Sequence, residues 1–212
     1  MRKKSLAFTL GEVLIALAVI GAIASLVLPQ MILGQKSNQA RSQFNTAYSL
    51  LGAAIARMDA DNVSLKPASY SSKEDFYNVI KKYQKISHDC GTTGLCDPNP
   101  AYQDIDASGA FILNNGMLVI VENAPDDTEV DNSGAVIVTV DINGNRKMPN
   151  KRGYDVFTFQ LVNGDIVPVG ADDTFTQASC SRNSNASTAA SMACSQEAAT
   201  DADYFKKVYN NM

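Results

Sequence analysis

A run of 23 residues without a charged side chain, Val13–Gln35, lies close to the start of this chain. As an α-helix the run would span roughly 35 Å at ~1.5 Å per residue, enough for a hydrocarbon core of ~30 Å. Three basic residues, Arg2, Lys3 and Lys4, precede it, and basic residues favour the cytoplasmic side of a membrane. The sequence therefore predicts one membrane-spanning helix, with the rest of the chain on the opposite side.

A single carboxylate, Glu12, stands directly before the apolar run. Its insertion into a bilayer costs on the order of 2–3 kcal/mol unless a partner neutralises the charge. A helix that served only as an anchor would gain nothing from this residue. We therefore expect Glu12 to meet a positive group in or near the membrane.

The residues around Glu12 resemble the N-terminal signal of the type IV pilin and type II secretion pseudopilin superfamily. In that signal a basic leader ends in a small residue, and an aromatic residue, Thr-Leu-x-Glu and an apolar helix follow. The matching residues are Ala7, Phe8, Thr9, Leu10 and Glu12. Ala7 replaces the usual glycine, and Gly11 replaces a branched aliphatic residue. The likeness covers about residues 3–35 and is much weaker beyond them.

This resemblance implies that a prepilin peptidase cuts between Ala7 and Phe8 and methylates the new amino group of Phe8. It also implies that an inner-membrane assembly platform adds the chain to a helical filament of identical or related subunits. Glu12 would then pair with the Phe8 amine of a neighbouring subunit. Gly21 and Pro29 stand where many pilins have residues that weaken the helix.

A protein of this kind would be a single-pass protein of the bacterial inner membrane, with its globular domain in the periplasm or on an extracellular filament. It would act through its surface and its polymerisation, so we expect no enzyme activity. A type IV pilus, a secretion filament and a DNA-uptake filament all remain open as its assembly.

Other interpretations of the N-terminus stay open as well. Arg2–Lys4, the apolar stretch and residues 21–24 also resemble an ordinary secretory signal with a cut after Ala24. Such a cut would release a soluble periplasmic protein that begins near Ser25. The carboxylate of Glu12 and the apolar residues that continue to Leu33 argue against this. The chain could also be a plain anchored protein, or a membrane-anchored or secreted binding protein that uses the segment only for export.

The long helix should continue beyond the membrane, because apolar residues recur at spacings of three and four. These residues are Phe44, Ala47, Tyr48, Leu51, Ile55 and Met58. We expect one helix from Phe8 to about Ala60, with a kink or a local opening at Pro29, which has no N–H to donate. The chain would then consist of a leader (1–7), a membrane or filament-core half of the helix (8–34), an amphipathic half (35–61) and a globular domain (62–212).

The globular part changes from helical to strand character, which predicts an α+β fold with an antiparallel sheet on the long helix. A short helix capped by Ser72 is expected first. An Asn-Gly turn at 114–116 predicts a hairpin. The expected strands are 111–113, 117–121, 135–142, 156–162 and 166–169. The expected loops are 88–102 and 179–200, and a last helix is expected within 201–209.

Four cysteines suit disulfide bonds in an oxidising compartment. Of the three open pairings we favour the two local ones, Cys90–Cys96 and Cys180–Cys194. A zinc site is the competing interpretation, but the chain has no Cys-x-x-Cys pair and His88 is its only histidine.

The charge balance argues against a nucleic-acid partner. Without the three basic residues at positions 2–4, 15 Lys and Arg stand against 22 Asp and Glu, a net charge of −7. Affinity for nucleic acid comes from cationic contacts with phosphate, which an acidic domain does not provide.

One local motif could hold calcium, although no other cofactor is indicated. Oxygen-bearing side chains alternate around a turn and could gather at a hard cation, and some pseudopilins carry calcium in this half of the domain. The candidate ligands are Asp141, Asn143, Asn145 and Asp155. The loop has no glutamate at the EF-hand spacing, and Arg146 stands where that motif has glycine. The alternative is a turn in which Asn and Gly supply left-handed conformations.

Support for catalysis is weak. His88 could act as a base only beside a nucleophile, and no Gly-x-Ser-x-Gly, His-Glu-x-x-His or phosphate-loop motif is present. The acidic run from Glu122 to Asp131, which includes Asp126, Asp127 and Glu129, is expected to be a solvated loop.

Overall fold

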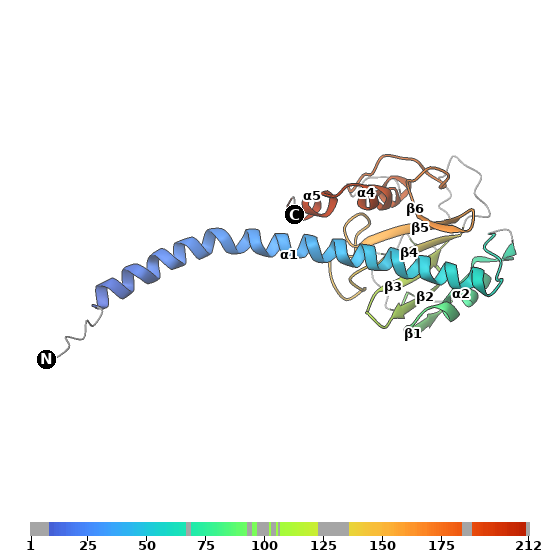
Figure 1. The fold of residues 1–212 in the computed structure, drawn as a ribbon, viewed down its shortest axis with the longest axis horizontal. Helices are drawn as coiled ribbons and strands as arrows, with labels where there is room; N and C mark the ends of the chain where they lie inside the picture. Colours follow the sequence, from blue (N-terminus) through green and yellow to red (C-terminus); the bar gives the residue numbers. More distant parts are fainter. Residues whose placement is uncertain are drawn as a thin grey trace.

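The computed structural model describes residues 9–66, 69–92, 95–96, 102, 105, 107–122, 136–183 and 188–210. These residues form one long helix, a six-stranded antiparallel sheet and several short helices, which confirms the predicted α+β fold. Figure 1 shows the long helix crossing the domain and extending far beyond it on the N-terminal side.

The long helix, α1, is one element from Leu10 to Ala60, and Thr9 is its N-cap. Its C-terminal end lies where the sequence predicted, before Asn62, whose φ of 58° is left-handed. The helix remains unbroken through Pro29 and curves over its length (Figure 1). The local opening that we considered at Pro29 is therefore not present in the single chain. Phe8, the predicted first residue, lies outside the described residues.

The second half of α1 packs against the sheet with the face that the apolar spacing predicted. Phe44, Leu51 and Met58 are almost fully buried on it, as are Ala47 and Ile55. Tyr48 is the exception, since 37% of it is exposed; its ring stacks on Phe159 at the edge of the interface.

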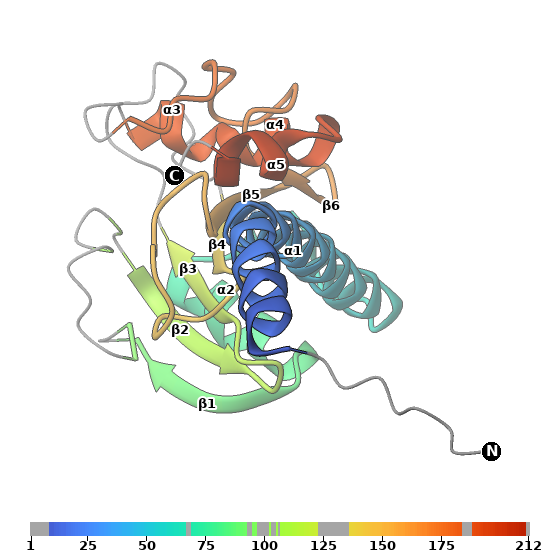
Figure 2. The same cartoon turned by 90° about the vertical axis from the view of Figure 1, so that its left-hand side faces the viewer.

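Six strands follow one another in space in the same order as in the chain, and every pair is antiparallel. They are β1 (Ile86–Gly91), β2 (Ala107–Leu113), β3 (Leu118–Glu122), β4 (Ile137–Asp141), β5 (Val156–Val162) and β6 (Asp165–Pro168). The sheet curves around α1, as Figure 2 shows. Each strand thus pairs with its neighbours in sequence, which is the arrangement of a β-meander.

Two turns set the register of this sheet. Gly116 has a φ of 87° in the turn between β2 and β3, which is the predicted Asn-Gly turn. Asn163 and Gly164, with φ values of 50° and 91°, join β5 to β6. This second turn has positive φ at both central residues, as a two-residue hairpin turn requires, and Asn-Gly meets that requirement with little strain.

The loop predicted over residues 88–102 is wrong in its first part, because β1 runs to Gly91 and pairs with β2. The Ser, His, Asp and Gly residues of β1 have low strand propensity. The pairing is interrupted twice by register shifts, and His88 and Asp89 are exposed. Such an irregular edge strand gives little alternation for a sequence pattern to reveal.

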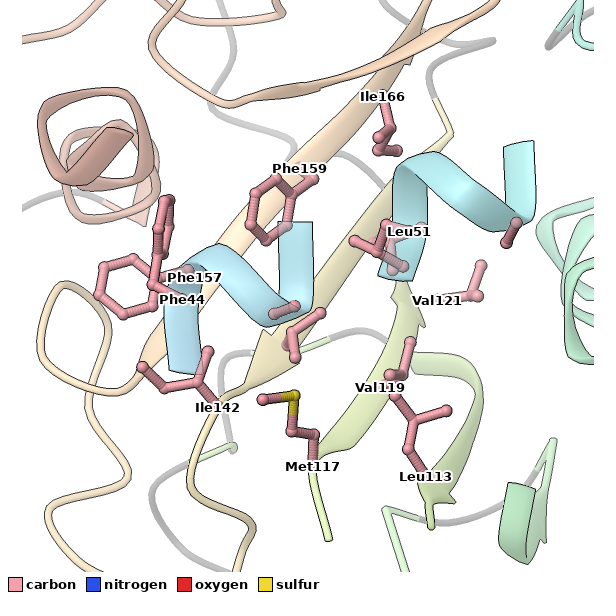
Figure 3. Close-up of a cluster of buried hydrophobic side chains, with 14 of the residues drawn as sticks. Phe44, Leu51, Leu113, Met117, Val119, Val121, Ile142, Phe157, Phe159 and Ile166 are labelled. Carbon is pink, nitrogen blue, oxygen red and sulfur yellow. The ribbon is translucent and has the colours of Figure 1, made fainter. Parts of the chain in front are cut away.

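The main core lies between α1 and the concave face of the sheet. Figure 3 shows Phe44 and Leu51 of the helix facing Val119, Phe157 and Phe159 of the strands. The rings of Phe44 and Phe157 meet edge to face, with centroids 4.9 Å apart. This aromatic packing fixes α1 on the sheet.

The opposite face of the sheet is buried as well. Tyr102 and Ile105 cover Leu118 and Ile120, while Phe175 and Met192 cover Ile137. All residues of β3 and β4 are therefore buried on both sides. A strand of this kind reads as a continuous apolar run, as β3 does.

The C-terminal region forms helices α3 (Thr188–Met192), α4 (Cys194–Thr200) and α5 (Tyr204–Asn210). The expected loop over 179–200 is thus wrong in its second half. Alanines there have high helix propensity but are too small to mark an apolar face clearly. The last helix, α5, was predicted; its Phe205 packs on Phe44 with ring centroids 5.8 Å apart.

The short helix predicted after Ser72 is also present. It consists of α2 (Lys73–Ile80) and a 3₁₀ turn, η2 (Lys81–Tyr83). The hydroxyl of Ser72 accepts the N–H of Asp75 at 3.1 Å, which is the predicted capping bond.

Candidate functional site

The first half of α1 projects away from the domain with its apolar side chains exposed (Figure 1). By length and composition, α1 is the one helix among the described residues that could cross a membrane. The exposed large side chains are Leu10, Val13, Leu14, Ile15, Leu17, Val19, Ile20, Ile23, Leu26, Val27, Leu28, Met31 and Ile32. They surround the helix rather than forming one stripe. An apolar surface of this size requires lipid or other helices around it.

Glu12 lies at the tip of this surface and is held by Thr9. Its Oε2 accepts the backbone N–H of Thr9 at 2.8 Å and the Thr9 hydroxyl at 2.9 Å. The Glu12 N–H in turn donates to Thr9 Oγ1 at 3.3 Å. The two residues thus form a capping box. The spacing Thr-x-x-Glu signals such a box in the sequence, whereas Glu12 was predicted only from its position before the apolar run.

The capping box gives Glu12 a role inside its own chain, in addition to the predicted pairing between subunits. One carboxylate oxygen, Oε2, accepts both bonds from Thr9, so Oε1 is left to meet another donor. The carboxylate is therefore fixed in position at the exposed end of α1.

The other predicted residues of the N-terminal region are only partly visible. Ala7 and Phe8, at the predicted cleavage and methylation site, lie outside the described residues. Gly21 lies in the exposed part of α1, and a side chain added there would meet nothing within 4 Å. Pro29 continues the helix. An open surface at Gly21 permits another helix to approach closely.

Both predicted disulfides are present, Cys90–Cys96 and Cys180–Cys194. The second bond joins the segment before α3 to the first residue of α4, with Cα atoms 4.4 Å apart. The predicted local pairing is therefore confirmed.

The turn that could hold calcium brings three of its four candidate side chains together. Asn143 links the two acids: its N–H donates to Asp141 Oδ1 at 3.1 Å, and its Nδ2 donates to Asp155 Oδ2 at 3.0 Å. Asn145 joins this turn through its backbone carbonyl, which accepts from Asn150 Nδ2 at 3.0 Å.

Burial and the mutual repulsion of the acids raise the pKa of Asp141 to about 7, and burial also raises the pKa of Asp155. Their oxygens already accept donors from the chain: Tyr102 and Gly144 donate to Asp141, and Lys151 and Asn150 donate to Asp155. This donor set favours the turn interpretation. Among the described residues no group of three or more His, Cys, Asp or Glu side chains gathers for a metal.

The expectation for the acidic run is wrong at its first residue. Glu122 is 1% exposed at the end of β3 and forms an ion pair with Arg152, whose Nη2 lies 3.1 Å from Glu122 Oε2. Thr139 donates its hydroxyl to Glu122, and Arg152 Nη1 donates to Thr158 at 2.7 Å. The other named acids of the run, Asp126, Asp127 and Glu129, lie outside the described residues.

His88 is exposed on β1, the edge strand. The described residues thus include a projecting apolar helix with a fixed carboxylate, and this is the feature with the clearest chemistry. Comparison of the chain with family models, curated proteins and solved structures finds no match.

Proposed function

We propose that this chain is a structural subunit of a membrane-anchored filament, of the type IV pilin or type II pseudopilin kind that its N-terminus resembles. The supporting observation is the exposed apolar half of α1, which ends in a positioned carboxylate and projects from a folded, disulfide-bonded domain. A lone anchor needs the apolar residues but not Glu12.

In this proposal, residues 8–34 lie in the inner membrane before assembly and in the filament core afterwards. A prepilin peptidase cuts between Ala7 and Phe8 and methylates the Phe8 amine, and an assembly platform delivers the subunit. The Phe8 amine of one subunit then meets Glu12 of another. Charge neutralisation in a low dielectric selects this register, whatever its net stabilisation.

Helix packing provides the second part of the assembly. Apolar helices in lipid associate through close packing, which small residues permit. Gly21, Ala22 and Ala24 provide such a site on an otherwise bulky helix. The globular domain remains outside the core, and the subunit performs no catalysis.

Because Glu12 both caps α1 and carries the charge, the test must separate these roles. Glu12→Gln keeps the capping box, since glutamine also accepts from the N-cap N–H, but it removes the charge. Thr9→Ala weakens the cap and keeps the charge. We expect Glu12→Gln to be processed and retained in the membrane without forming filaments, and Thr9→Ala to form them.

Filament yield from sheared cells and mass spectrometry of the mature N-terminus provide the measurements. A mature chain that begins at methylated Phe8 supports the proposal. A chain that begins near Ser25, or normal filaments from Glu12→Gln, would contradict it and favour a periplasmic binding protein.

Calcium binding at the turn of Asp141 and Asp155 remains a prediction. The amide oxygens of Asn143 and Asn150 are buried without a hydrogen-bond donor and could serve as additional neutral ligands. Isothermal titration of the full chain with Ca²⁺, with Asp155→Asn as the control, tests it. If the wild type shows no heat of binding, the calcium prediction is wrong and the residues form only a turn.

A further inference from the structure

Two exposed basic side chains, Lys36 and Lys147, line one groove where α1 leaves the domain, and Arg146 precedes Lys147 in the chain. Lys36 lies on α1, while Arg146 and Lys147 lie on the connection between β4 and β5. In Figure 2, which views the molecule from the N-terminal half of α1, this connection lies beside the helix. We refer to Lys36, Arg146 and Lys147 as the basic patch. Among the residues that the structure describes, no carboxylate forms a salt bridge with it.

A groove of about 520 Å³ lies within this patch. Lys36 and Lys147 contribute its cationic groups, and Leu33, Met148, Pro149 and Tyr209 contribute apolar or aromatic surface. Met148 is 78% exposed, more than any other large apolar side chain that the structure describes beyond residue 60. The groove thus combines two amines with an apolar floor and opens beside the helix.

A second groove on α1 has acidic rather than basic side chains. It has a volume of about 860 Å³ and lies farther along α1 between the helix and β6, and Asp59 and Asp165 line it. The two grooves therefore differ in charge, and the groove of Lys36 and Lys147 is the one next to the apolar half of the helix.

We infer that the groove of Lys36 and Lys147 binds the headgroup of an anionic phospholipid. The apolar run ends at Gln35, directly before Lys36, so a membrane around that run places lipid phosphates at the level of the groove. The two amines bind the phosphate, and an acyl chain lies along Leu33 towards the bilayer. Met148 enters the interfacial layer next to it.

Such a contact would hold the domain in one orientation on the membrane before assembly. Each Lys or Arg near an anionic surface adds attraction, and two of them on separate elements prevent rotation of the domain about α1. Extraction into a filament would then release the lipid. This inference rests on the membrane anchoring in the proposed function.

The experiment uses the full chain in nanodiscs of phosphatidylcholine with and without phosphatidylglycerol, with bound lipid identified by native mass spectrometry. The test variant is Lys36→Gln with Lys147→Gln. The control is Lys66→Gln with Lys82→Gln, which removes the same charge from exposed positions outside the groove. We expect the wild type and the control to retain phosphatidylglycerol roughly tenfold better than phosphatidylcholine, and the test variant to lose this preference.

Equal retention of both lipids by the wild type would overturn the inference, as would an equal loss in the control. Flotation of the same samples with vesicles separates this failure from that of the proposed function. A chain that floats without lipid preference contradicts only the headgroup site. A chain that does not float contradicts the membrane anchoring and the headgroup site together.

Discussion

The guanidinium of Arg152 lies 3.1 Å from the carboxylate of Glu122, and both side chains are buried on the face of the sheet that points away from α1. Thr139 and Thr158, on β4 and β5, bond to this pair and to each other. A row of polar groups therefore crosses three strands inside the domain. The bonds of Arg152 thus tie the turn before β5 to the end of β3.

Removal of one charge from this pair should destabilise the domain strongly. Arg152→Met leaves Glu122 buried without a cation, which typically costs about 3–5 kcal/mol. The double variant Arg152→Met with Glu122→Leu should recover most of that loss, because it removes both charges. Denaturant unfolding of the full chain in detergent provides the measurement.

The control for this prediction is the pair of Lys207 and Asp201, which lie 2.6 Å apart but remain partly exposed. Asp201→Asn should change the free energy of unfolding far less than Arg152→Met does, as is usual for surface pairs. Similar losses in Arg152→Met and Asp201→Asn would show that the buried pair has no special importance.

Stability should decrease as the pH rises through neutrality, because of Asp141. Burial and the charge of Asp155 raise its pKa to about 7 in the folded state, against an ordinary value near 3.9. The stabilising contribution is therefore complete below about pH 4 and is lost as the pH rises through about 7. Between about pH 5 and pH 8 the ionisation of Asp141 should lower the free energy of unfolding by about 2 kcal/mol.

Asp141→Asn tests the pH prediction, since asparagine keeps the bonds to Asn143, Gly144 and Tyr102 without an ionisable group. Unfolding curves of the variant should depend less on pH than those of the wild type. The same slope in both proteins would assign the pH dependence to other groups.

The two disulfides should differ in their contribution to stability. Cys180 and Cys194 are 14 residues apart, and a loop of that length corresponds to about 3 kcal/mol. Cys90 and Cys96 are 6 apart and restrict the unfolded chain less. Replacement by serines should therefore lower the unfolding midpoint more for Cys180 and Cys194 than for Cys90 and Cys96. Peptide mapping without reduction checks the pairing, and free thiols in the cellular protein would contradict export.

The segment from Gly21 to Pro29 should behave differently in a filament. It is helical in the single chain, yet Pro29 donates no backbone bond and Gly21 has low helix propensity. Neighbouring helices and the Ser25 hydroxyl could satisfy carbonyls that open there; in the single chain that hydroxyl donates to the Ala22 carbonyl at 2.7 Å. Pro29→Ala should make filaments stiffer under tension. A filament map with an unbroken helix over these residues would contradict the prediction.

The sequence predicted those elements whose signals are local. The hairpin turns contain Asn-Gly, the helix α2 has its Ser72 cap, and α1 has a regular apolar spacing. It could not predict that Glu122 is buried, because the cation that compensates it, Arg152, lies 30 residues away and enters from a separate turn. Likewise, β1 forms because it pairs with β2, although its own residues have low strand propensity.

The candidate site followed the same rule. Glu12 was predicted from its position before the apolar run, and its bond to Thr9 was encoded by a four-residue spacing. The groove of Lys36 and Lys147 joins residues from two elements far apart in the chain. Lys36 is marked by its position directly after the apolar run, but nothing in the sequence places Lys147 beside it, so only the folded chain brings the two together.

The contact between Phe44 and Phe205 has a consequence for biogenesis. Among the described elements, α5 is synthesised last, yet it covers the face of α1 that is synthesised first, and Arg41 donates to the Ala202 carbonyl beside it. During synthesis, Phe44 and Phe157 therefore remain without the ring of Phe205 until α5 has been made. A chain that stopped before α5 would expose these rings to chaperones and proteases, so that an incomplete copy is recognised by its own uncovered core.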